Sequence, residues 1–300
     1  MLREQLNFGS KGFQAIPNLP FLLLPVYVFG LNSQGEPVSA FADKFYSARI
    51  IDRRDISADL WSFRVDPGGE FPYRAGQYAT LGVVTPEKHH ERPYSIVSAP
   101  HEKNLEFFFE LVPHGQVTPR FHKFRVGDEI TMRKTAKGNF TLDLSGKCAN
   151  HLLIATVTGV APFVSYVRSL RREWENAKSS GANRLFILEG ASRSWEMGYS
   201  AELEKVAGEV SWLTYVPTVS RPWEDQGWSG EIGRVDDLIR KYTDMWKLKP
   251  GDTKVYLCGH PNMIENTRGI VRRRGWEEHS IQAEAYFVPP RHDYTTESEE

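Results

Sequence analysis

The chain has 300 residues, of which 40% are hydrophobic and 25% are charged, and this balance fits a globular protein of two ordinary domains. The formal net charge of −1 at pH 7 lacks the basic excess of nucleic-acid-binding proteins, so no nucleic-acid partner is expected. The two cysteines, Cys148 and Cys258, are too few for a disulfide framework, an all-cysteine zinc site or an iron–sulfur cluster. We therefore expect a protein of the reducing cytoplasm.

Residues 1–42 are predicted to be an N-terminal extension. Its apolar run, NLPFLLLPVYVFG at 18–30, is too short to cross a bilayer and contains two prolines, so no membrane span is expected. The first twenty residues are hardly basic and the small-residue segment at 40–42 lies far from the apolar run, which disfavours a signal peptide. The extension is compatible with covering an apolar patch on the same chain or on a second subunit, and the oligomeric state stays open.

Residues 43–146 are predicted to form an antiparallel β-barrel domain, because short runs rich in aromatic and β-branched residues alternate with Pro, Gly, Asp and Asn. The expected strands are KFYSARIIDRRDI (44–56), DLWSFRVDP (59–67), QYATLGVV (77–84), RPYSIVSAP (92–100), NLEFFFELVP (104–113) and DEITMRK (128–134).

Residues 147–288 are predicted to form a doubly wound α/β domain, followed by a C-terminal tail at 289–300. Continuous apolar runs are typical of buried parallel strands, and here they alternate with helical stretches. The expected strands are HLLIATVTG (151–159), RLFILEGAS (184–192), VSWLTYVPTVS (210–220) and KVYLCGH (254–260), with helices near 234–246 and 261–275. The ligand crevice of such a domain lies beyond the carboxyl ends of its strands.

Candidate phosphate-binding groups occur at these strand ends. Thr158 and Gly159 form a turn that enters a helix and can offer backbone N–H groups to a phosphate, although the segment is not G-x-G-x-x-G. Taken alone, such a turn is structural more often than functional. Arg193 and Arg221 each follow a serine directly after a strand, a pair suited to a phosphate monoester, but either arginine alone also fits a solvated loop.

Five motifs in register carry a resemblance to a known family. They are RPYS (92–95), HGQVT (114–118), TGVAPF (158–163), CGHPNMI (258–264) and AEAYF (283–287). In this order the chain resembles the FAD-dependent ferredoxin-NADP reductase family, bacterial type, over about residues 43–288. The resemblance implies a flavoprotein oxidoreductase that transfers hydride between NADP(H) and FAD, and single electrons to or from ferredoxin or flavodoxin.

The resemblance also implies the FAD-binding residues. Those expected to bind FAD are Arg92, Pro93, Tyr94, Ser95, Gln116, Val117, Thr118, Thr158 and Phe287. Arg92 would pair with the pyrophosphate, Tyr94 would lie against the isoalloxazine and ribityl region, and Ser95 would hydrogen-bond near flavin N5. The segment 116–118 would form a second pyrophosphate clamp at a helix N-terminus. Phe287 would cover the flavin face, with its neighbour Tyr286 as a competitor for that place.

The implied nicotinamide site lies at the strand ends of the second domain. Its expected residues are Thr158, Gly159, Ser192, Arg193, Arg221 and Cys258, although Val157 stands where many members of the family carry glycine. Ser95, Cys258 and Glu284 are the expected catalytic residues. By default a buried Cys is a small hydrophobic residue and Glu284 is a surface carboxylate.

Coenzyme choice is argued from charge. Arg193 and Arg221 match positions that hold the 2′-phosphate of NADP in similar reductases, and Ser192 adds a neutral hydrogen bond, which favours NADP(H). Glu231 argues the other way, because a carboxylate repels a 2′-phosphate or accepts from a free 2′-hydroxyl, so NAD(H) stays possible.

Other interpretations were weighed. His89 and His90 lack a third ligand at suitable spacing and are interpreted as loop residues, so no metal site is expected. No G-x-S-x-G segment supports a hydrolase. The basic VRRRG at 271–275 reads as a solvated helix end, though a basic surface could help to dock an acidic redox protein. Two alternatives stay open: a reductase component of an oxygenase system, and a flavin-binding subunit of a larger complex.

Overall fold

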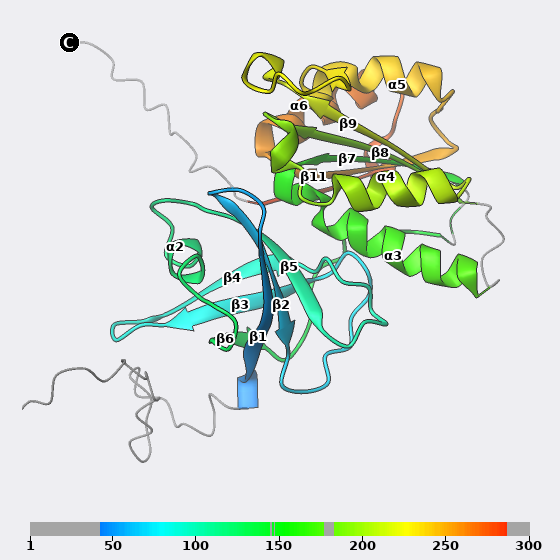
Figure 1. Ribbon diagram of the computed structural model, residues 1–300. Helices are drawn as coiled ribbons and strands as arrows, with labels where there is room; N and C mark the ends of the chain where they lie inside the picture. The colour runs from blue at the N-terminus through cyan, green and yellow to red at the C-terminus, as the bar shows by residue number, and fades with distance from the viewer. Residues whose placement is uncertain (1–42, 145, 147, 177–182, 287–300) are drawn as a thin grey trace, which may run out of the picture.

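The computed structural model describes residues 43–144, 146, 148–176 and 183–286. The extension 1–42, the tail 289–300 and Phe287 lie outside the described residues. The described chain forms two domains, each built on its own six-stranded sheet (Figure 1). The predicted fold class is confirmed: an antiparallel barrel precedes a parallel α/β domain.

The first sheet forms the barrel. Its strands are β1 (Phe45–Asp55), β2 (Leu60–Asp66), β3 (Tyr78–Val84), β4 (His89–Ser95), β5 (Leu105–Glu110) and β6 (Glu129–Arg133), in the order β4-β3-β6-β1-β2-β5. The outer strands approach each other where Ile96, just after β4, makes an antiparallel bridge to Phe107 of β5. A single helical turn, α2 (Thr118–Phe121), packs Phe121 into the aromatic interior of the barrel.

Alternation along β5 explains how the barrel meets the second domain. Leu105, Phe107 and Phe109 point into the barrel core, as a strand period of two requires. Phe108, on the opposite face, joins the hydrophobic core of the second domain and packs edge-on against Tyr199 at 5.3 Å between ring centroids. The run LEFFFE is therefore buried on both faces because it lies between the barrel interior and the neighbouring domain.

The second sheet is entirely parallel. Its strands are β7 (Asn150–Thr156), β8 (Arg184–Ala191), β9 (Leu213–Val219), β10 (Glu231–Ile232), β11 (Thr253–Gly259) and β12 (Ile281–Ala285), in the order β10-β9-β8-β7-β11-β12. The strand order reverses between β7 and β11. In doubly wound sheets, ligands bind beyond the carboxyl ends of the strands at this reversal.

Helices cover both faces of the parallel sheet. The α-helices are α3 (Ala161–Glu175), α4 (Ser200–Glu209), α5 (Ile239–Met245) and α6 (Pro261–Arg273), and the 3-10 turns are η1 (Val157–Val160), η2 (Ser194–Glu196), η3 (Pro222–Glu224), η4 (Val235–Leu238) and η5 (Glu278–Ser280). Helices α3 and α4 pack on the face toward the barrel, and α5 and α6 pack on the other (Figure 1).

Two sequence interpretations need correction or addition. His89 and His90 are the first residues of β4, not loop residues, and His89 Nε2 lies 2.7 Å from Thr131 Oγ1 of β6 in the same sheet. Strand β12 was not predicted, although its last three residues, Ala283–Ala285, begin the AEAYF segment. Across the described ranges, no cluster of three or more His, Cys, Asp or Glu is arranged to hold a metal. In the same ranges, no helix has the length and apolarity needed to cross a bilayer.

Candidate active site

The two domains meet at a hydrogen bond between predicted catalytic residues. The Ser95 hydroxyl, at the end of β4, donates to Glu284 Oε1 of β12 over 2.8 Å, although 189 positions separate the two residues. Ser95 is 7% exposed. Burial raises the pKa of Glu284, and the Ser95 hydrogen bond opposes this only in part. The junction therefore holds a carboxyl group that retains a proton more readily than a surface glutamate does.

Three further residues lie at the same junction. Cys258 is fully buried at the end of β11, in register with Glu284 of β12. Burial, followed by the nearby Glu284 carboxylate, raises the pKa of the Cys258 thiol. Tyr286 lies just after β12 and donates its hydroxyl to the carbonyl of Thr158. The predicted residues Ser95, Thr158, Cys258 and Glu284 are therefore brought together, and Tyr286 joins them.

Two glycines allow the main chain to pass closely enough to form this junction. A Cβ on Gly159 would lie 2.2 Å from the carbonyl oxygen of Cys258, and a Cβ on Gly259 would lie 2.2 Å from Thr156 Oγ1. Gly259 also has a φ of +132°, which strongly favours glycine. The Thr-Gly turn and the Cys-Gly strand end are thus two sides of one close backbone contact.

Val157 stands at the position where many members of the similar family carry glycine. Its φ is +46°, in the left-handed region, where a β-branched residue is a genuine outlier. This conformation costs about 1–2 kcal/mol for an L-residue. Val157 packs partly against the hydrophobic core and lines the cavity described below, so the turn keeps a glycine-type backbone with an apolar side chain at the cavity wall.

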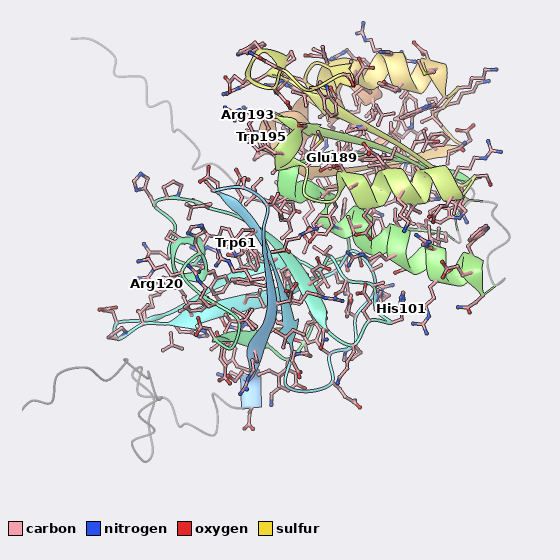
Figure 2. The ribbon with its side chains drawn as sticks, viewed as in Figure 1. Trp61, His101, Arg120, Glu189, Arg193 and Trp195 are labelled. Atoms are coloured by element: carbon pink, nitrogen blue, oxygen red, sulfur yellow. The ribbon has the colours of Figure 1, made fainter. Side chains whose placement is uncertain are left out.

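Unpaired cations lie on the barrel beside β4. Arg92 is exposed and donates only to the neighbouring Glu91 carbonyl, at 2.7 Å. Arg120 follows Thr118 in α2 and donates to Gln116 (Figure 2). Neither arginine has a carboxylate partner among the residues that the structure describes. Burial lowers the pKa of His90, and the nearby Arg120 charge adds to this effect, which places Arg120 on the same side as β4.

Donor groups are also available at the start of α2. The backbone N–H groups of Gln116, Val117 and Thr118 have no hydrogen-bond acceptor within the described part of the chain. The Thr118 hydroxyl accepts from the backbone N–H of Val112 at 3.0 Å, which fixes this turn. Free N–H groups at a helix start beside two arginines fit a pyrophosphate. This donor set fits the diphosphate of FAD.

Tyr94 lies between these cations and the domain junction. Its ring packs edge-on against Phe109, with 4.9 Å between centroids, and against Phe121 at 6.1 Å. Burial raises the pKa of its hydroxyl. Pro93 precedes it on the exposed side of β4. The barrel core therefore fixes the position of the Tyr94 ring. Along β4, Tyr94 lies between Arg92 and Ser95.

A cavity of about 370 Å³ opens at the carboxyl ends of the parallel strands. Its lining residues include Thr156, Val157, Ser192, Arg221, Arg234 and His260. The volume falls within the range of ligand pockets, and the position is the one expected for a doubly wound sheet. Arg234 was not predicted as a site residue, because it was expected to begin the helix near 234–246.

Arg193 stands at this end of the domain but is already paired. Its guanidinium donates to Glu196 Oε1 at 2.8 Å and to Glu224, and these two hydrogen bonds raise its pKa. The guanidinium also lies 5.8 Å from the ring centre of Trp195, and Figure 2 shows both side chains at this end of the domain. Arg221 is half exposed, and its nearest carboxylate is Glu224 at 3.7 Å.

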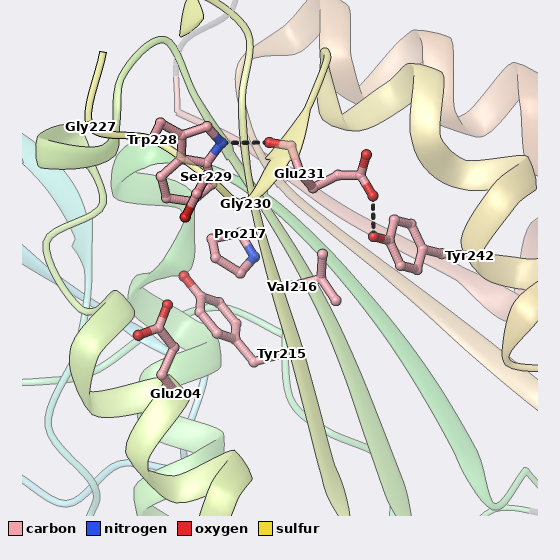
Figure 3. Close-up of a pocket in the computed structure, with 10 residues that line it drawn as sticks. All are labelled: Glu204, Tyr215, Val216, Pro217, Gly227, Trp228, Ser229, Gly230, Glu231 and Tyr242. Carbon is pink, nitrogen blue, oxygen red and sulfur yellow. Dashed lines mark hydrogen bonds between the residues drawn. The ribbon is translucent and has the colours of Figure 1, made fainter. Parts of the chain in front are cut away.

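Glu231 lies in a different pocket from Arg221. This second pocket, of about 450 Å³, is lined by residues of β9, β10 and the preceding loop (Figure 3). The Glu231 carboxylate accepts from Lys241 and Tyr242, and the Lys241 hydrogen bond lowers its pKa. The negative charge of Glu231, which on sequence grounds disfavoured NADP(H), is therefore satisfied by Lys241 and Tyr242, and Glu231 does not line the strand-end cavity.

A partly buried ionic network also joins the two domains. Arg168 of α3 contacts Glu202 of α4 at 2.7 Å, and Glu106 and Glu102 of the barrel domain at 2.8 and 3.4 Å. Tyr199 donates to the other oxygen of Glu106 at 2.7 Å. Burial opposes the Arg168 charge, but Glu202 and Glu106 raise its pKa above the ordinary value. This network and the Ser95–Glu284 hydrogen bond fix the domains at two separate points.

Comparison with known proteins assigns the class. The Oxidoreductase FAD-binding domain family matches residues 47–142, and the Oxidoreductase NAD-binding domain family matches residues 153–269. A crystal structure of a ferredoxin NADP+ reductase from Neisseria gonorrhoeae with bound FAD and NADP shares the fold, with a TM-score of 0.71, 24% identity, and coverage of 81% of this chain and 99% of that one. The fold and the site thus define an oxidoreductase that uses FAD and a nicotinamide nucleotide.

Sequence relatives give the family. Ferredoxin–NADP reductase A of Sorangium cellulosum is 31% identical over 229 residues, which cover 73% of this chain and 80% of the relative. The ferredoxin–NAD(P)(+) reductase component of a naphthalene 1,2-dioxygenase system from Pseudomonas putida is 32% identical over 250 residues, or 81% of this chain and 70% of the relative. The chain belongs to the ferredoxin–NADP reductase family, so the predicted family is confirmed.

Proposed function

We propose that this protein transfers hydride between NADP(H) and FAD, and exchanges single electrons with a ferredoxin-type carrier. The observation that carries the proposal is the Ser95–Glu284 hydrogen bond of 2.8 Å, at a junction that also contains Thr158, Cys258 and Tyr286. FAD, when bound, accepts a hydride as one unit and can release its electrons singly.

The barrel residues bind and orient the flavin. Arg92, with the unpredicted Arg120, would neutralise the pyrophosphate, and the free N–H groups of residues 116–118 would donate to it. Tyr94, whose ring is fixed by Phe109, would bind the isoalloxazine and ribityl region. The proposal includes Pro93 among the FAD-binding residues. It also includes the predicted domain limits, 43–146 for the FAD-binding domain and 147–288 for the NADP(H)-binding domain.

The junction residues hold the nicotinamide and move a proton. Glu284 carries a raised pKa and accepts from the Ser95 hydroxyl, so the pair could relay a proton, with Glu284 giving its proton to Ser95 Oγ as the Ser95 hydroxyl gives its own to the bound cofactor. Cys258 and Thr158 form the wall on which the nicotinamide ring would rest, since Gly159 lets the two backbones touch there. Tyr286 borders the same space, since its hydroxyl donates to the Thr158 carbonyl.

The carrier is proposed from the family. The names of both relatives include ferredoxin, which supports a ferredoxin partner, and flavodoxin is the alternative carrier. The relative from Pseudomonas putida belongs to a dioxygenase system, and this observation favours a second candidate: a reductase component that supplies an oxygenase.

The test begins with the visible spectrum of the purified protein and its oxidation of NADPH and NADH with ferricyanide. FAD absorption and turnover with ferricyanide support the proposal, and reduction of an added ferredoxin or flavodoxin identifies the carrier. Protein that holds FAD but oxidises neither coenzyme would contradict the proposed enzyme and favour a non-catalytic electron-transfer subunit. Ser95→Ala should slow flavin reduction with FAD still bound, whereas Arg92→Ala should weaken FAD retention.

A further inference from the structure

Glu224 lies between two arginines, Arg193 and Arg221, of which Arg221 lines the strand-end cavity. Its Oε2 accepts from the guanidinium of Arg193, and its Oε1 lies 3.7 Å from Nη1 of Arg221. The Glu224 side chain is 35% exposed and ends η3, three residues after Arg221. A protein carboxylate thus lies between Arg193 and Arg221, where a phosphate was expected from the sequence.

The other anion-binding groups of this loop are also satisfied internally. The backbone N–H groups of Ser192 and Arg193 donate to Glu196 Oε2 at 2.8 and 3.2 Å. The N–H of Ser194 donates to Asp225 Oδ2 at 2.7 Å. Protein carboxylates therefore take up the main-chain donors at the end of β8, and a ligand phosphate would have to rely on the arginine side chains.

Charge at the rim follows from these pairings. Arg193 pairs with Glu196 and Glu224, Arg221 with Glu224, and Arg234 with Asp236, while a fourth carboxylate, Asp225, accepts from the backbone N–H of Ser194. Glu196 and Asp225 are fixed by backbone donors, and Asp236 is 4% exposed and accepts from Asn266. Glu224 alone among the four binds only side-chain cations, so it is the carboxylate that an incoming anion can displace.

We propose that Glu224 competes with the 2′-phosphate of NADP(H) for Arg193 and Arg221, and so sets the coenzyme selectivity of this site. This inference rests on the proposed function, because it assumes that a nicotinamide nucleotide enters the cavity. With Glu224 in place, a 2′-phosphate must displace a paired carboxylate, whereas the 2′-hydroxyl of NAD(H) can leave it undisturbed. Glu224 thereby reduces the difference in affinity between NADP(H) and NAD(H), so that the protein binds both coenzymes.

The test compares two adenine nucleotides that differ at the 2′ position. Binding of adenosine 2′,5′-bisphosphate and adenosine 5′-monophosphate to the FAD-loaded protein is measured by calorimetry, with no turnover required. Glu224→Gln should tighten the bisphosphate by about tenfold and change the monophosphate by less than about twofold. Glu224→Ala should act in the same direction, and the visible flavin spectrum checks that each variant is folded.

The chain offers a matched control in Glu209→Gln. Glu209 pairs with Arg171 at 2.7 Å and is 40% exposed, close to the value for Glu224, but it lies away from the cavity. This variant should change neither affinity. The selectivity role of Glu224 alone would be overturned if a Glu224 variant changed the affinity for both nucleotides equally. It would also be overturned if neither Glu224 variant changed either affinity while the unaltered protein binds both nucleotides. If the unaltered protein binds neither nucleotide, the proposed function itself fails. In turnover, Glu224→Gln should lower KM for NADPH and leave KM for NADH unchanged.

Discussion

Replacing Arg168 by glutamine should separate the stability of the domain junction from the binding of FAD. Arg168 is 19% exposed at its side chain and contacts Glu202, Glu106 and Glu102 within 3.4 Å. Removing the cation leaves Glu106, 9% exposed at its side chain, with the Tyr199 hydroxyl as its remaining strong partner. Deleting one member of a buried ionic group costs about 3–5 kcal/mol, and we expect about 3 kcal/mol here.

Arg171→Gln is the control for this prediction. Arg171 lies one turn further along α3 and pairs with Glu175 and Glu209, all within the second domain and partly exposed. Its loss should lower the free energy of unfolding by less than about 1 kcal/mol. Urea unfolding followed by tryptophan fluorescence gives both values.

The same pair of variants tests the positioning role of the network. Arg168→Gln should slow flavin reduction by NADPH by about tenfold, because small misplacement of reacting groups is costly, while the FAD dissociation constant stays unchanged. Equal unfolding energies and equal reduction rates in the two variants would refute the reasoning.

Three further predictions concern the site and the sheet. Glu284→Gln should slow flavin reduction without loss of FAD, and it should remove the pH dependence of that step near the raised pKa of Glu284. Stopped-flow absorbance measures the rate of flavin reduction at each pH. An unchanged dependence of this rate on pH would contradict the role of Glu284 in proton transfer. Gly159→Ala should destabilise the fold by about 2–3 kcal/mol in urea, since its Cβ would lie 2.2 Å from the Cys258 carbonyl oxygen, and wild-type stability would refute the close contact. Glu189 is fully buried and accepts from the Tyr215 hydroxyl at 2.6 Å, and burial raises its pKa from 4.5 to about 8. Because the folded state holds this proton more tightly, the free energy of unfolding should fall by on the order of 4 kcal/mol as pH rises from about 4.5 to about 8, and Glu189→Gln should flatten that slope.

The sequence predicted the two sheets well because their strands carry different hydrophobic periods. The alternating runs of the barrel and the continuous apolar runs of the parallel sheet each point to one arrangement. Most predicted site residues are likewise explained by topology, since Thr158 lies in the turn just after β7 and Cys258 lies near the end of the adjacent parallel strand β11.

Other features depend on contacts between distant residues, and composition carries no record of them. The pairing of Ser95 with Glu284 crosses the domain boundary, and β12 is a short edge strand with little periodicity of its own. The neutralisation of Arg193 by Glu224 requires two loops that are separate in the sequence to meet in space. Phe287 lies outside the described residues, and its role over the flavin stays a prediction.

Anaerobic titration of the purified, FAD-loaded protein with NADPH tests the central claim most directly. If Ser95, Thr158, Cys258 and Glu284 form the junction at which hydride is transferred, one equivalent of NADPH should bleach the visible flavin absorption, and Glu284→Gln should bleach more slowly to the same end point. Persistent oxidised flavin with excess NADPH and with excess NADH would contradict the account.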